Sequence, residues 1–253
     1  SATANMSSME TIFYGASAMN PTRLVEGINK WGQIFYQFFG QSECPMVISN
    51  MTRKEHDLSK PERLSSCGRP SPWIHLSLRD PEGNEVPRGE PGEICIRGPL
   101  IMKGYKDMPE QTAEAFAGGW LHTGDVGKLD DDGFLYIVDR TKDMIVTGGF
   151  NVFPREVEDV LGTHEAVGQV VVIGVPDEQW GEAVKAVIVL KPDFEASEEL
   201  ISSMQALVKK AKGSVQSPKS IDFVAAIPLT PVGKPDKKTV RAQYWVDSDR
   251  GVG

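Results

Sequence analysis

The residues best suited to chemistry form a short segment near the C-terminus that is bracketed by proline and glycine, Pro228-Leu229-Thr230-Pro231-Val232-Gly233-Lys234. Its lysine is a compact positive charge on a long stem, which suits delivery from a loop. A cation placed between two anions, such as a carboxylate and an α-phosphate, lowers their repulsion most in the transition state. Lys234 taken alone is more typical of a solvated surface lysine, so other stretches must support the argument.

Two further stretches supply groups that can hold a nucleotide. Trp120-Leu121-His122-Thr123-Gly124-Asp125 places Asp125 in a predicted glycine-flanked turn, where its carboxylate can accept both hydroxyls of a ribose. The plain structural alternative is an Asx-turn, in which Asp125 bonds its own backbone. Arg140 lies in a short charged segment, 139–143, which we interpret as a link between domains. Arg140 is therefore either a ligand contact or a surface ion-pair residue.

Polar and glycine-rich segments also follow two predicted strands. Phe39-Gly40-Gln41-Ser42-Glu43 comes directly after a buried strand at 34–38. There Gly40 lets a ligand approach the backbone, Ser42 can donate to a phosphate oxygen and Glu43 can hold Mg²⁺. Phe39 can stack on a base, although a strand-exit turn explains the same residues. Gly148-Gly149-Phe150-Asn151 either follows a narrow ligand channel or forms a plain turn.

Other nucleotide and nucleophile motifs do not fit. Gly127-Lys128 and Gly233-Lys234 are followed by leucine and proline, so neither is a Walker lysine, and no G-x-G-x-x-G occurs. Gly15-Ala16-Ser17-Ala18-Met19 lacks the last glycine of the serine-hydrolase nucleophile elbow. We therefore disfavour a serine hydrolase.

Composition narrows the class of protein further. The 253 residues include 35 acidic and 27 basic ones, and the absence of a basic run argues against nucleic-acid binding. No apolar run approaches the ~20 residues needed to span a bilayer, and the polar start does not predict a signal peptide. The cysteines and histidines are widely spaced, which predicts neither a disulfide framework nor a metal cluster and favours a reducing cytoplasm. They are Cys44, Cys67, Cys95, His56, His75, His122 and His164.

The elements that must position these residues change character along the chain. A strand at 11–14, a helix that begins at Asn20-Pro21 and ends at Gly32, and the strand at 34–38 predict an α/β layer. The apolar stripe of that helix consists of Leu24, Val25, Ile28 and Trp31. From 68 to 138, short strands at 74–78, 93–97 and 134–138 alternate with Pro/Gly-rich turns, which predicts a small antiparallel sheet or barrel.

A compact α+β unit follows the charged link. It contains a helix at 154–161, valine-rich strands at 169–175 and 183–190, and a last strand at 221–225. Ser197 caps another helix, which Gly213 ends. The predicted fold class is thus α/β and α+β.

Taken in order, these stretches resemble the adenylate-forming superfamily, which includes acyl-CoA synthetases, luciferases and the adenylation domains of peptide synthetases. The resemblance runs from about Ile12 to Tyr244, and 150–158 is most similar to bacterial fatty-acyl-CoA ligases. It implies that 1–138 is the C-terminal portion of the large AMP-binding domain, an α/β piece plus a small β-barrel-like subdomain. It also implies a hinge at 139–143 and a small mobile C-terminal domain at 144–253.

The resemblance assigns roles to particular residues. Phe39 would stack on adenine in a place usually held by tyrosine, and Ser42 would contact phosphate where threonine is commoner. Asp125 would hold the ribose. The full set for ATP and AMP is Gly15, Ala16, Ser17, Phe39, Gly40, Gln41, Ser42, Asp125, Arg140 and Lys234.

Catalysis and the second half-reaction involve other positions in the resemblance. Lys234 would serve adenylation and Glu43 would bind Mg²⁺. Lys142 matches the hinge about which the small domain swings. Gly148, Gly149 and Phe150 would line the pantetheine tunnel for CoA.

The implied reaction converts a carboxylic acid, with a fatty acid favoured, and ATP to acyl-AMP, and then transfers the acyl group to CoA. The substrates would be the acid, ATP with Mg²⁺, and CoA. The phosphate-binding loop of the family, which ends in Pro-Lys-Gly, is not found before Ile12. We therefore expect a C-terminal fragment that makes no acyl-CoA alone.

Three other readings stay open: a ligase that loads a carrier protein, a luciferase-like oxygenase, and a non-catalytic binding or structural module. The oligomeric state also stays open, with a homodimer as one option.

Overall fold

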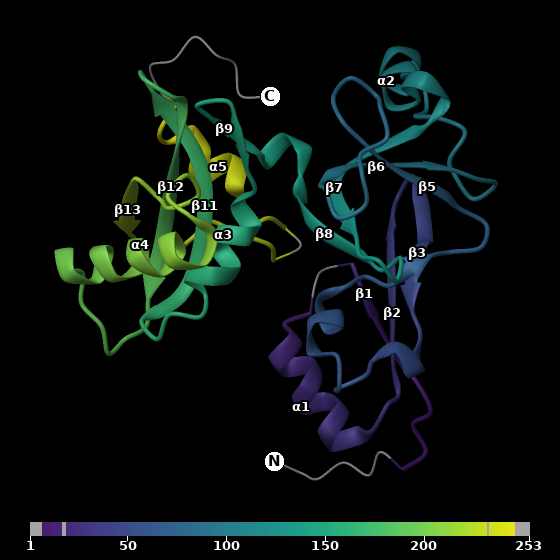
Figure 1. Cartoon of the computed structure of the whole chain (residues 1–253), viewed down its shortest axis with the longest axis horizontal. Coiled ribbons are helices and arrows are strands. Elements are labelled where there is room, and N and C mark those ends of the chain that lie inside the picture. The colour runs from purple at the N-terminus through teal and green to yellow at the C-terminus, as the bar shows by residue number, and fades with distance from the viewer. Residues whose placement is uncertain (1–6, 17–18, 232, 246–253) are drawn as a thin grey trace. The chain divides into compact units, whose positions relative to one another are not determined.

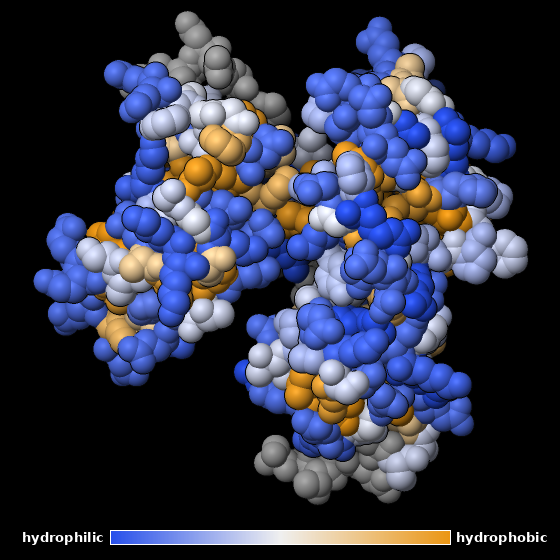
Figure 2. Space-filling model, viewed as in Figure 1, coloured by the Kyte–Doolittle hydropathy of each residue, from blue (hydrophilic) through white to orange (hydrophobic). Residues whose placement is uncertain are grey.

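The computed structural model of this chain describes residues 7–16, 19–231 and 233–245 (Figure 1). The chain divides into two compact units, residues 1–138 and 139–253, each with its own core. Among the described residues, no helix combines the length and the apolar character that a bilayer crossing requires. On the face shown in Figure 2, the surface of each unit is largely hydrophilic, with apolar residues showing between polar ones.

The first layer of unit 1 is a four-stranded sheet in the order β1-β2-β3-β4 with one helix, α1. Its elements are β1 (Ile12–Gly15), α1 (Pro21–Trp31), β2 (Phe35–Gln41), β3 (Cys44–Met51) and β4 (Arg69–Pro70). β1 and β2 are parallel, and α1 makes the crossover between them. This arrangement confirms the predicted α/β layer.

Helix α1 begins and ends where its sequence predicts. The Asn20 side chain accepts a hydrogen bond from the Thr22 amide, and Gly32 ends the helix with φ of 83°. Leu24 and Ile28 of the predicted apolar stripe are buried, whereas Trp31 at the end of that stripe is 39% exposed. Trp31 lies in the last turn, where its ring centroid is 6.2 Å from that of Phe35 and 5.4 Å from the Lys30 Nζ.

The second layer of unit 1 is an antiparallel sheet in the order β5-β6-β7-β8, with β5 and β8 at its edges. Its strands are β5 (His75–Arg79), β6 (Gly92–Arg97), β7 (Leu121–Leu129) and β8 (Leu135–Arg140). The helix α2 (Pro109–Ala115) lies between β6 and β7 in the chain, and sequence patterns did not indicate it. Short 3₁₀ turns occupy η1 (Arg53–Glu55), η2 (Pro61–Ser65) and η3 (Ala117–Gly119).

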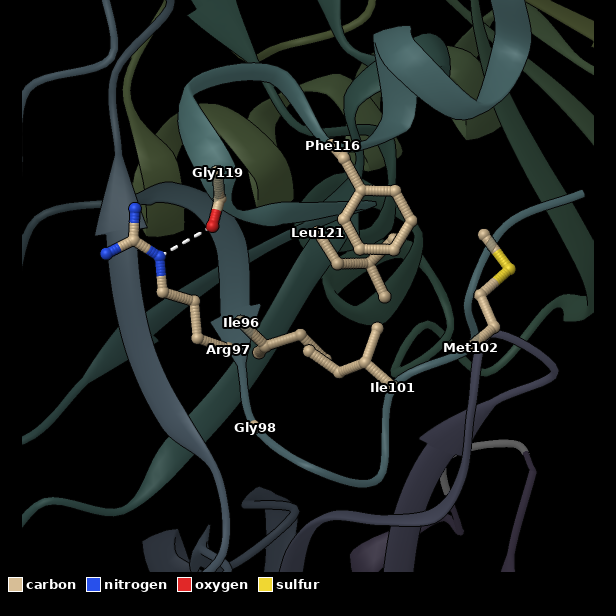
Figure 3. A pocket seen from close by; sticks show the side chains of 8 residues that line it. All are labelled: Ile96, Arg97, Gly98, Ile101, Met102, Phe116, Gly119 and Leu121. Carbon is tan, nitrogen blue, oxygen red and sulfur yellow. Dashed lines mark hydrogen bonds between the residues drawn. The ribbon is translucent and has the colours of Figure 1, made fainter. Parts of the chain in front are cut away.

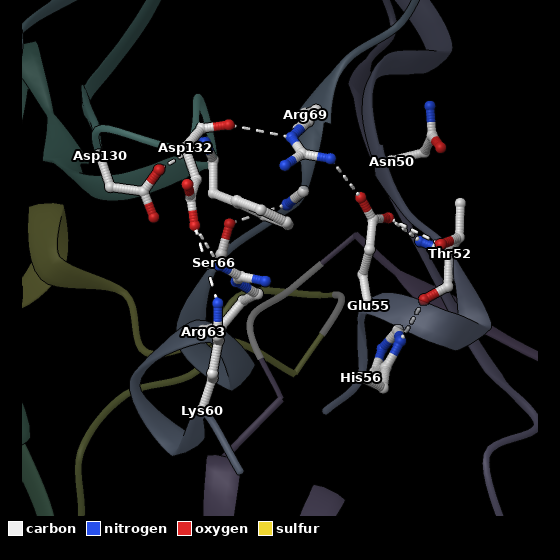
Figure 4. Close-up of polar contacts among 12 residues, drawn as sticks. Asn50, Thr52, Glu55, His56, Lys60, Arg63, Ser66, Arg69, Asp130 and Asp132 are labelled. Atoms are coloured by element: carbon white, nitrogen blue, oxygen red, sulfur yellow. Dashed lines mark hydrogen bonds and ion pairs between the residues drawn. The ribbon is translucent and has the colours of Figure 1, made fainter. Parts of the chain in front are cut away.

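Two arginines link the turn before β8 to the first layer of unit 1, and Figure 4 shows their ion pairs with Asp132 and Glu55. They lie over the buried ring of Phe134. The guanidinium carbons of Arg63 and Arg69 lie 4.1 and 4.2 Å from the ring centroid of Phe134. Arg63 also pairs with Asp132 at 2.5 Å, and Arg69 pairs with Glu55 at 3.0 Å. Because each cation lies over the aromatic ring and is held by a carboxylate, the turn before β8 is fixed against η1, η2 and β4.

Unit 2 is a five-stranded sheet with helices on both faces. Its elements are β9 (Ile145–Thr147), β10 (Phe150–Val152), α3 (Pro154–Leu161), β11 (Val167–Asp177), β12 (Gly181–Leu190), α4 (Glu198–Lys212), β13 (Ser220–Phe223) and α5 (Lys237–Ala242). The strand order is β10-β9-β12-β11, and β13 pairs with β12. The 3₁₀ turn η4 (Thr141–Asp143) precedes β9.

Alternation along β11 divides the core of unit 2 in two. Val172 packs with Val157 of α3 and Met204 of α4, whereas Val171 packs with Val240 of α5. Successive side chains of a strand point to opposite faces, so one valine-rich strand supplies both cores. The predicted α+β class is confirmed. Lys237 and Lys238 begin α5, a helix that the sequence patterns did not indicate.

Candidate functional site

Asp125 lies inside strand β7 at a bulge, so the predicted glycine-flanked turn is wrong. Glu93 of β6 pairs with Val126 and Cys95 pairs with His122, which leaves Ile94 opposite the three residues 123–125. The backbone accommodates them because Gly124 adopts φ of 69°, which favours glycine. Strand pairing continues on both sides, and a bulge of this kind redirects a side chain.

The bulge brings Asp125 to another predicted nucleotide residue, Gln41 of β2. The Gln41 Nε2 donates to Asp125 Oδ2 at 2.6 Å and to the Thr123 carbonyl oxygen at 3.0 Å. Asp125 is only 7% exposed. Two residues 84 positions apart therefore form one carboxylate–amide pair. A hydrogen bond to a carboxylate is short and directional, so Gln41 orients Asp125.

Three residues that sequence reasoning did not single out support the bulge. Glu93 Oε1 accepts from the Gly124 amide at 3.0 Å, and Glu93 Oε2 lies 2.7 Å from His122 Nδ1. The Cys95 Sγ lies 3.5 Å from the same nitrogen. Burial, reinforced by the charge of Glu93, raises the pKa of Cys95 to about 12. The sequence analysis treated the cysteines and histidines as too widely spaced to form a cluster. That is wrong for Cys95 and His122, which strand pairing brings together. The available signal was the two-residue spacing of Glu93 and Cys95.

The glycine-rich segment after β1 is tightly packed. A Cβ on Gly15 would lie 2.3 Å from the Phe38 carbonyl oxygen of the neighbouring strand. Ala16 adopts φ of 63°, in the left-handed region. Ser17, the third residue predicted for the adenine pocket, lies outside the described residues.

The segment from Phe39 to Gln41 belongs to strand β2, not to the strand exit that the sequence predicted. Gln41 pairs with Cys44, so only Ser42 and Glu43 form the turn into β3. A Cβ on Gly40 would lie 2.5 Å from the Met46 amide nitrogen, which explains the glycine by close strand packing. Phe39 is half-buried and packs against the core of the second sheet.

Glu43 is half-buried at this turn. Its Oε1 accepts from the Tyr105 hydroxyl at 2.9 Å, and this bond is the main reason that the pKa of Tyr105 is raised. Its carbonyl oxygen accepts from the Met102 amide. Mg²⁺ is commonly held by one or two carboxylates together with substrate phosphates and water, so the donor chemistry of Glu43 fits this ion.

A shallow recess of about 240 Å³ lies beside the second sheet of unit 1 (Figure 3). Its wall includes the apolar side chains of Ile101, Met102 and Phe116. The Arg97 Nε donates to the Gly119 carbonyl oxygen at 2.6 Å at its edge. None of the predicted nucleotide-binding residues that the structure describes lines this recess.

In unit 2, Lys234 lies on a closed, exposed turn. The Thr230 amide donates to the Lys234 carbonyl oxygen at 2.7 Å, and the Lys234 amide donates to Thr230 Oγ1 at 3.1 Å. Leu229 and Pro235 form an isolated bridge at the base of this turn. Asp236 continues directly into α5, because its Oδ1 accepts from the Thr239 amide. The turn is therefore attached to a helix at its C-terminal end.

That helix is anchored by an ion pair in the interior of unit 2. Lys237 Nζ lies 2.9 Å from Glu158 Oε1, and the same oxygen accepts from the Val172 amide at 2.8 Å. The side chains are 21% and 17% exposed. Burial raises the pKa of Glu158, and the charge of Lys237 offsets part of that effect. Sequence patterns gave no indication of this pair.

The predicted hinge and CoA residues occupy the start of unit 2. Arg140 ends β8 and Lys142 lies in η4, both with exposed side chains. Gly148 and Gly149, with φ of 57° and 82°, form the turn between β9 and β10. Phe150 begins β10, a strand that sequence reasoning missed, and is 60% exposed.

Asp139, the first residue of the predicted charged link, is buried instead of solvated. It is 6% exposed, and its carboxylate accepts from the Arg140 and Arg155 amides at 2.8 and 2.7 Å. The Arg155 amide lies in the first turn of α3, where an aspartate satisfies a helix N–H group and interacts favourably with the dipole. Asp139 thus ties the start of unit 2 to its first helix.

Comparison with known proteins shows relatives over nearly the whole chain. A family model described as AMP-binding enzyme matches residues 1–106, and one described as AMP-binding enzyme C-terminal domain matches residues 156–234. A medium/long-chain-fatty-acid–CoA ligase of Mycobacterium tuberculosis is 55% identical over 99% of this chain and 44% of that protein. A fatty acid–acyl-carrier-protein ligase of Streptomyces coeruleorubidus is 34% identical over 94% of this chain and 45% of that protein.

Solved structures give the same result. The amide bond synthetase McbA from Marinactinospora thermotolerans matches with a TM-score of 0.84 and 38% identity, over 95% of this chain and 48% of that one. ATP-bound MatB from Rhodopseudomonas palustris matches with a TM-score of 0.80 and 31% identity, over 92% and 45%. The chain therefore spans about half the length of the proteins it matches. Two family models in consecutive order, together with these relatives, show that the chain belongs to the adenylate-forming superfamily and is a homologue of fatty-acid–CoA ligases.

Proposed function

We propose that this chain forms part of an AMP-forming acid–thiol ligase that activates a carboxylic acid with ATP and transfers the acyl group to CoA. The observation that supports this most is the orientation of Asp125 by Gln41 within the β7 bulge. A fixed carboxylate can accept two hydrogen bonds from neighbouring hydroxyls, which matches the diol of a ribose. The match of residues 1–106 to a family model described as AMP-binding enzyme supports the binding of a nucleotide by the intact protein.

The first half-reaction joins the acid to AMP. A carboxylate oxygen bonds to the α-phosphorus of ATP, and pyrophosphate leaves. The ammonium of Lys234 reduces the repulsion between the two anions as they approach. Glu43 would hold Mg²⁺, which supplies positive charge to the phosphates when it is bound. We assign the remaining nucleotide contacts to Gly15, Ala16, Ser17, Phe39, Gly40, Ser42 and Arg140.

The second half-reaction replaces AMP by a thiol. The thiol loses its proton to solvent, its sulfur bonds to the acyl carbonyl carbon, and AMP leaves with the electron pair of the broken carbon–oxygen bond. AMP is a far better leaving group than hydroxide, which explains why the acid is first adenylated. Gly148, Gly149 and Phe150 would line the path of the CoA pantetheine, and Lys142 would serve as the hinge between the half-reactions. The exposed aromatic ring of Phe150 and the positive φ angles of both glycines support a surface path for a narrow ligand.

The identities of the carboxylic acid and of the thiol acceptor are proposed from the names of the relatives. The relative with 55% identity is named as a medium/long-chain-fatty-acid–CoA ligase, which supports a fatty acid and CoA. A relative with 34% identity is named as a ligase for an acyl carrier protein, so loading of a carrier protein is the second candidate. The two candidates share adenylation and differ only in the thiol.

The experiment uses a full-length ligase that contains this chain. Exchange of radiolabelled pyrophosphate into ATP is measured with fatty acids of increasing length, and thioester formation is then measured with CoA, pantetheine or a carrier protein. We expect exchange that depends on a fatty acid and a thioester with CoA. A thioester with the carrier protein alone would select the second candidate. Absence of exchange with every carboxylic acid would overturn the proposal.

The proposal also covers the activity of residues 1–253 alone, the cellular compartment and the oligomeric state. We propose that residues 1–253 alone make no acyl-CoA, and pyrophosphate exchange by this chain would contradict that. The three cysteines are buried thiols, and we propose a reducing compartment such as the cytoplasm. A homodimer stays an option that size-exclusion chromatography with light scattering would decide.

A further inference from the structure

Unit 1 contains a cluster of nitrogen, sulfur and oxygen donors that adenylation does not use. Glu93 and Cys95 lie two residues apart on β6, so their side chains are on the same face of the sheet. His122 of β7 pairs directly with Cys95. One donor atom from each of the three residues lies within 4.8 Å of the others. From this geometry we infer that Glu93, Cys95 and His122 form a binding site for a zinc-class divalent metal ion.

The spacing of the donors matches tetrahedral zinc closely. Zn–S and Zn–N bonds of about 2.3 and 2.0 Å, at the tetrahedral angle, place sulfur and nitrogen about 3.5 Å apart. Cys95 Sγ and His122 Nδ1 lie 3.5 Å apart. Glu93 Oε2 lies 2.7 Å from the same nitrogen, which is a hydrogen-bond distance. Two bonds of about 2.0 Å at the tetrahedral angle place nitrogen and oxygen about 3.3 Å apart, so the carboxylate would need to withdraw by about 0.6 Å when a metal replaces the proton between the two atoms.

The other histidine nitrogen already has the contact that metal-binding histidines usually make. His122 Nε2 lies 3.2 Å from the Ala117 carbonyl oxygen, which can only accept a hydrogen bond. A proton on Nε2 fixes the ring orientation and leaves Nδ1 as the nitrogen that faces Cys95 and Glu93. Ligating histidines almost always donate their second N–H to a carboxylate, carbonyl or water. Ala117 supplies that support here.

The cluster also has a route for an ion from solvent. Cys95 is fully buried, whereas the side chains of Glu93 and His122 are 24% and 28% exposed. An ion would approach past the two exposed ligands and meet sulfur at the inner side, with water as a fourth ligand. The thiol proton would leave to solvent, because a coordinating thiol is deprotonated by the metal. Sulfur and imidazole select zinc-class ions over Mg²⁺, which prefers oxygen ligands.

The test is metal titration of the purified 253-residue chain after dialysis against a chelator. Zn²⁺ and Mg²⁺ are titrated separately by calorimetry, and Co²⁺ is added as a spectroscopic probe. We expect one Zn²⁺ per chain, little binding of Mg²⁺, and a thiolate-to-Co²⁺ charge-transfer band in the near ultraviolet. The readout needs no nucleotide, so it succeeds or fails independently of the proposed ligase activity.

Matched variants locate the ion. Cys95→Ala and His122→Gln should each weaken Zn²⁺ binding by more than about 100-fold, since changes to supporting residues alone cost 10–100-fold. Cys44→Ala, which removes another buried thiol, and His75→Gln, which removes an exposed imidazole, should leave the affinity unchanged. Zn²⁺ binding that survives Cys95→Ala would overturn the inference. So would the lack of a charge-transfer band in the unmodified chain, an outcome that does not depend on any variant folding.

Discussion

Replacement of Lys237 by methionine tests how the Lys234 turn is held in place. Lys237→Met removes the cation that lies 2.9 Å from Glu158 Oε1 and keeps a stem of similar length. Removal of one partner from a buried ion pair costs about 3–5 kcal/mol. The Glu158 side chain is 17% exposed and keeps the Val172 amide as a donor, so we expect the low end, about 3 kcal/mol.

The assay is urea unfolding at pH 7, with amide hydrogen exchange at Val172 as a local probe of unit 2. Lys238→Met is the matched control, because Lys238 is the exposed neighbour in the same helix and should change stability by less than about 0.5 kcal/mol. The double variant Glu158→Gln, Lys237→Met should recover most of the loss, since a neutral amide can still accept from Val172. Equal effects of Lys237→Met and Lys238→Met would refute the reasoning.

The pH dependence of the same variant provides a second check. Burial raises the pKa of Glu158 above its ordinary value of 4.5, and Lys237 opposes that rise. Above pH 4.5 the folded state therefore holds a proton that the unfolded state has lost, so stability falls as pH rises through this window. Without Lys237, the pKa of Glu158 in the folded state is higher, so the pH range over which stability falls extends further upward. The deficit of Lys237→Met should grow from pH 4.5 to 7, and an equal deficit at both values would contradict the assignment of a buried charge.

Three more predictions concern unit 1. Gln41→Leu should lower the free energy of unfolding by about 1.5–3 kcal/mol, because Asp125 loses a charge-assisted hydrogen-bond donor. It should also weaken AMP binding. Gln111→Leu, at an exposed position of α2, is the control, and equal effects of the two variants would argue against the prediction. Gly15→Ala should lower the melting temperature and cost about 1–3 kcal/mol, since its Cβ would lie 2.3 Å from a carbonyl oxygen of β2; unchanged melting would contradict that close packing. Burial lowers the pKa of His56, so the unfolding free energy should fall as pH drops below 6.5, where the unfolded state binds the proton first. His56→Gln should flatten that slope, and an unaltered slope would exclude His56 as its source.

Local patterns in the sequence predicted α1, α3 and α4, but neither α2 nor α5. The bounds of α1 follow from Asn20 and Gly32, and those of α4 follow from Ser197 and Gly213. These residues act through hydrogen bonds to amides or carbonyls within one turn of the helix, so the necessary information is local.

The β7 bulge could not be predicted in the same way. Thr123-Gly124-Asp125 has the composition of a turn, and only pairing with β6 on both sides makes it part of a strand. The contact between Gln41 and Asp125 depends on how two sheets pack, which no spacing in the sequence reveals. The Glu158–Lys237 pair is equally non-local, because it joins α3 to α5.

The central claim is that Lys234 acts in adenylation and not in thioester formation. The most direct measurement separates the half-reactions in a full-length ligase that contains this chain and carries Lys234→Ala, with Lys238→Ala as control. We expect the rate of acyl-AMP formation to fall by about 10²–10³-fold, a loss typical for removal of one transition-state charge partner. Conversion of supplied acyl-AMP and CoA to acyl-CoA should keep its original rate. Equal loss of both half-reactions, or unchanged adenylation, would contradict the role of Lys234.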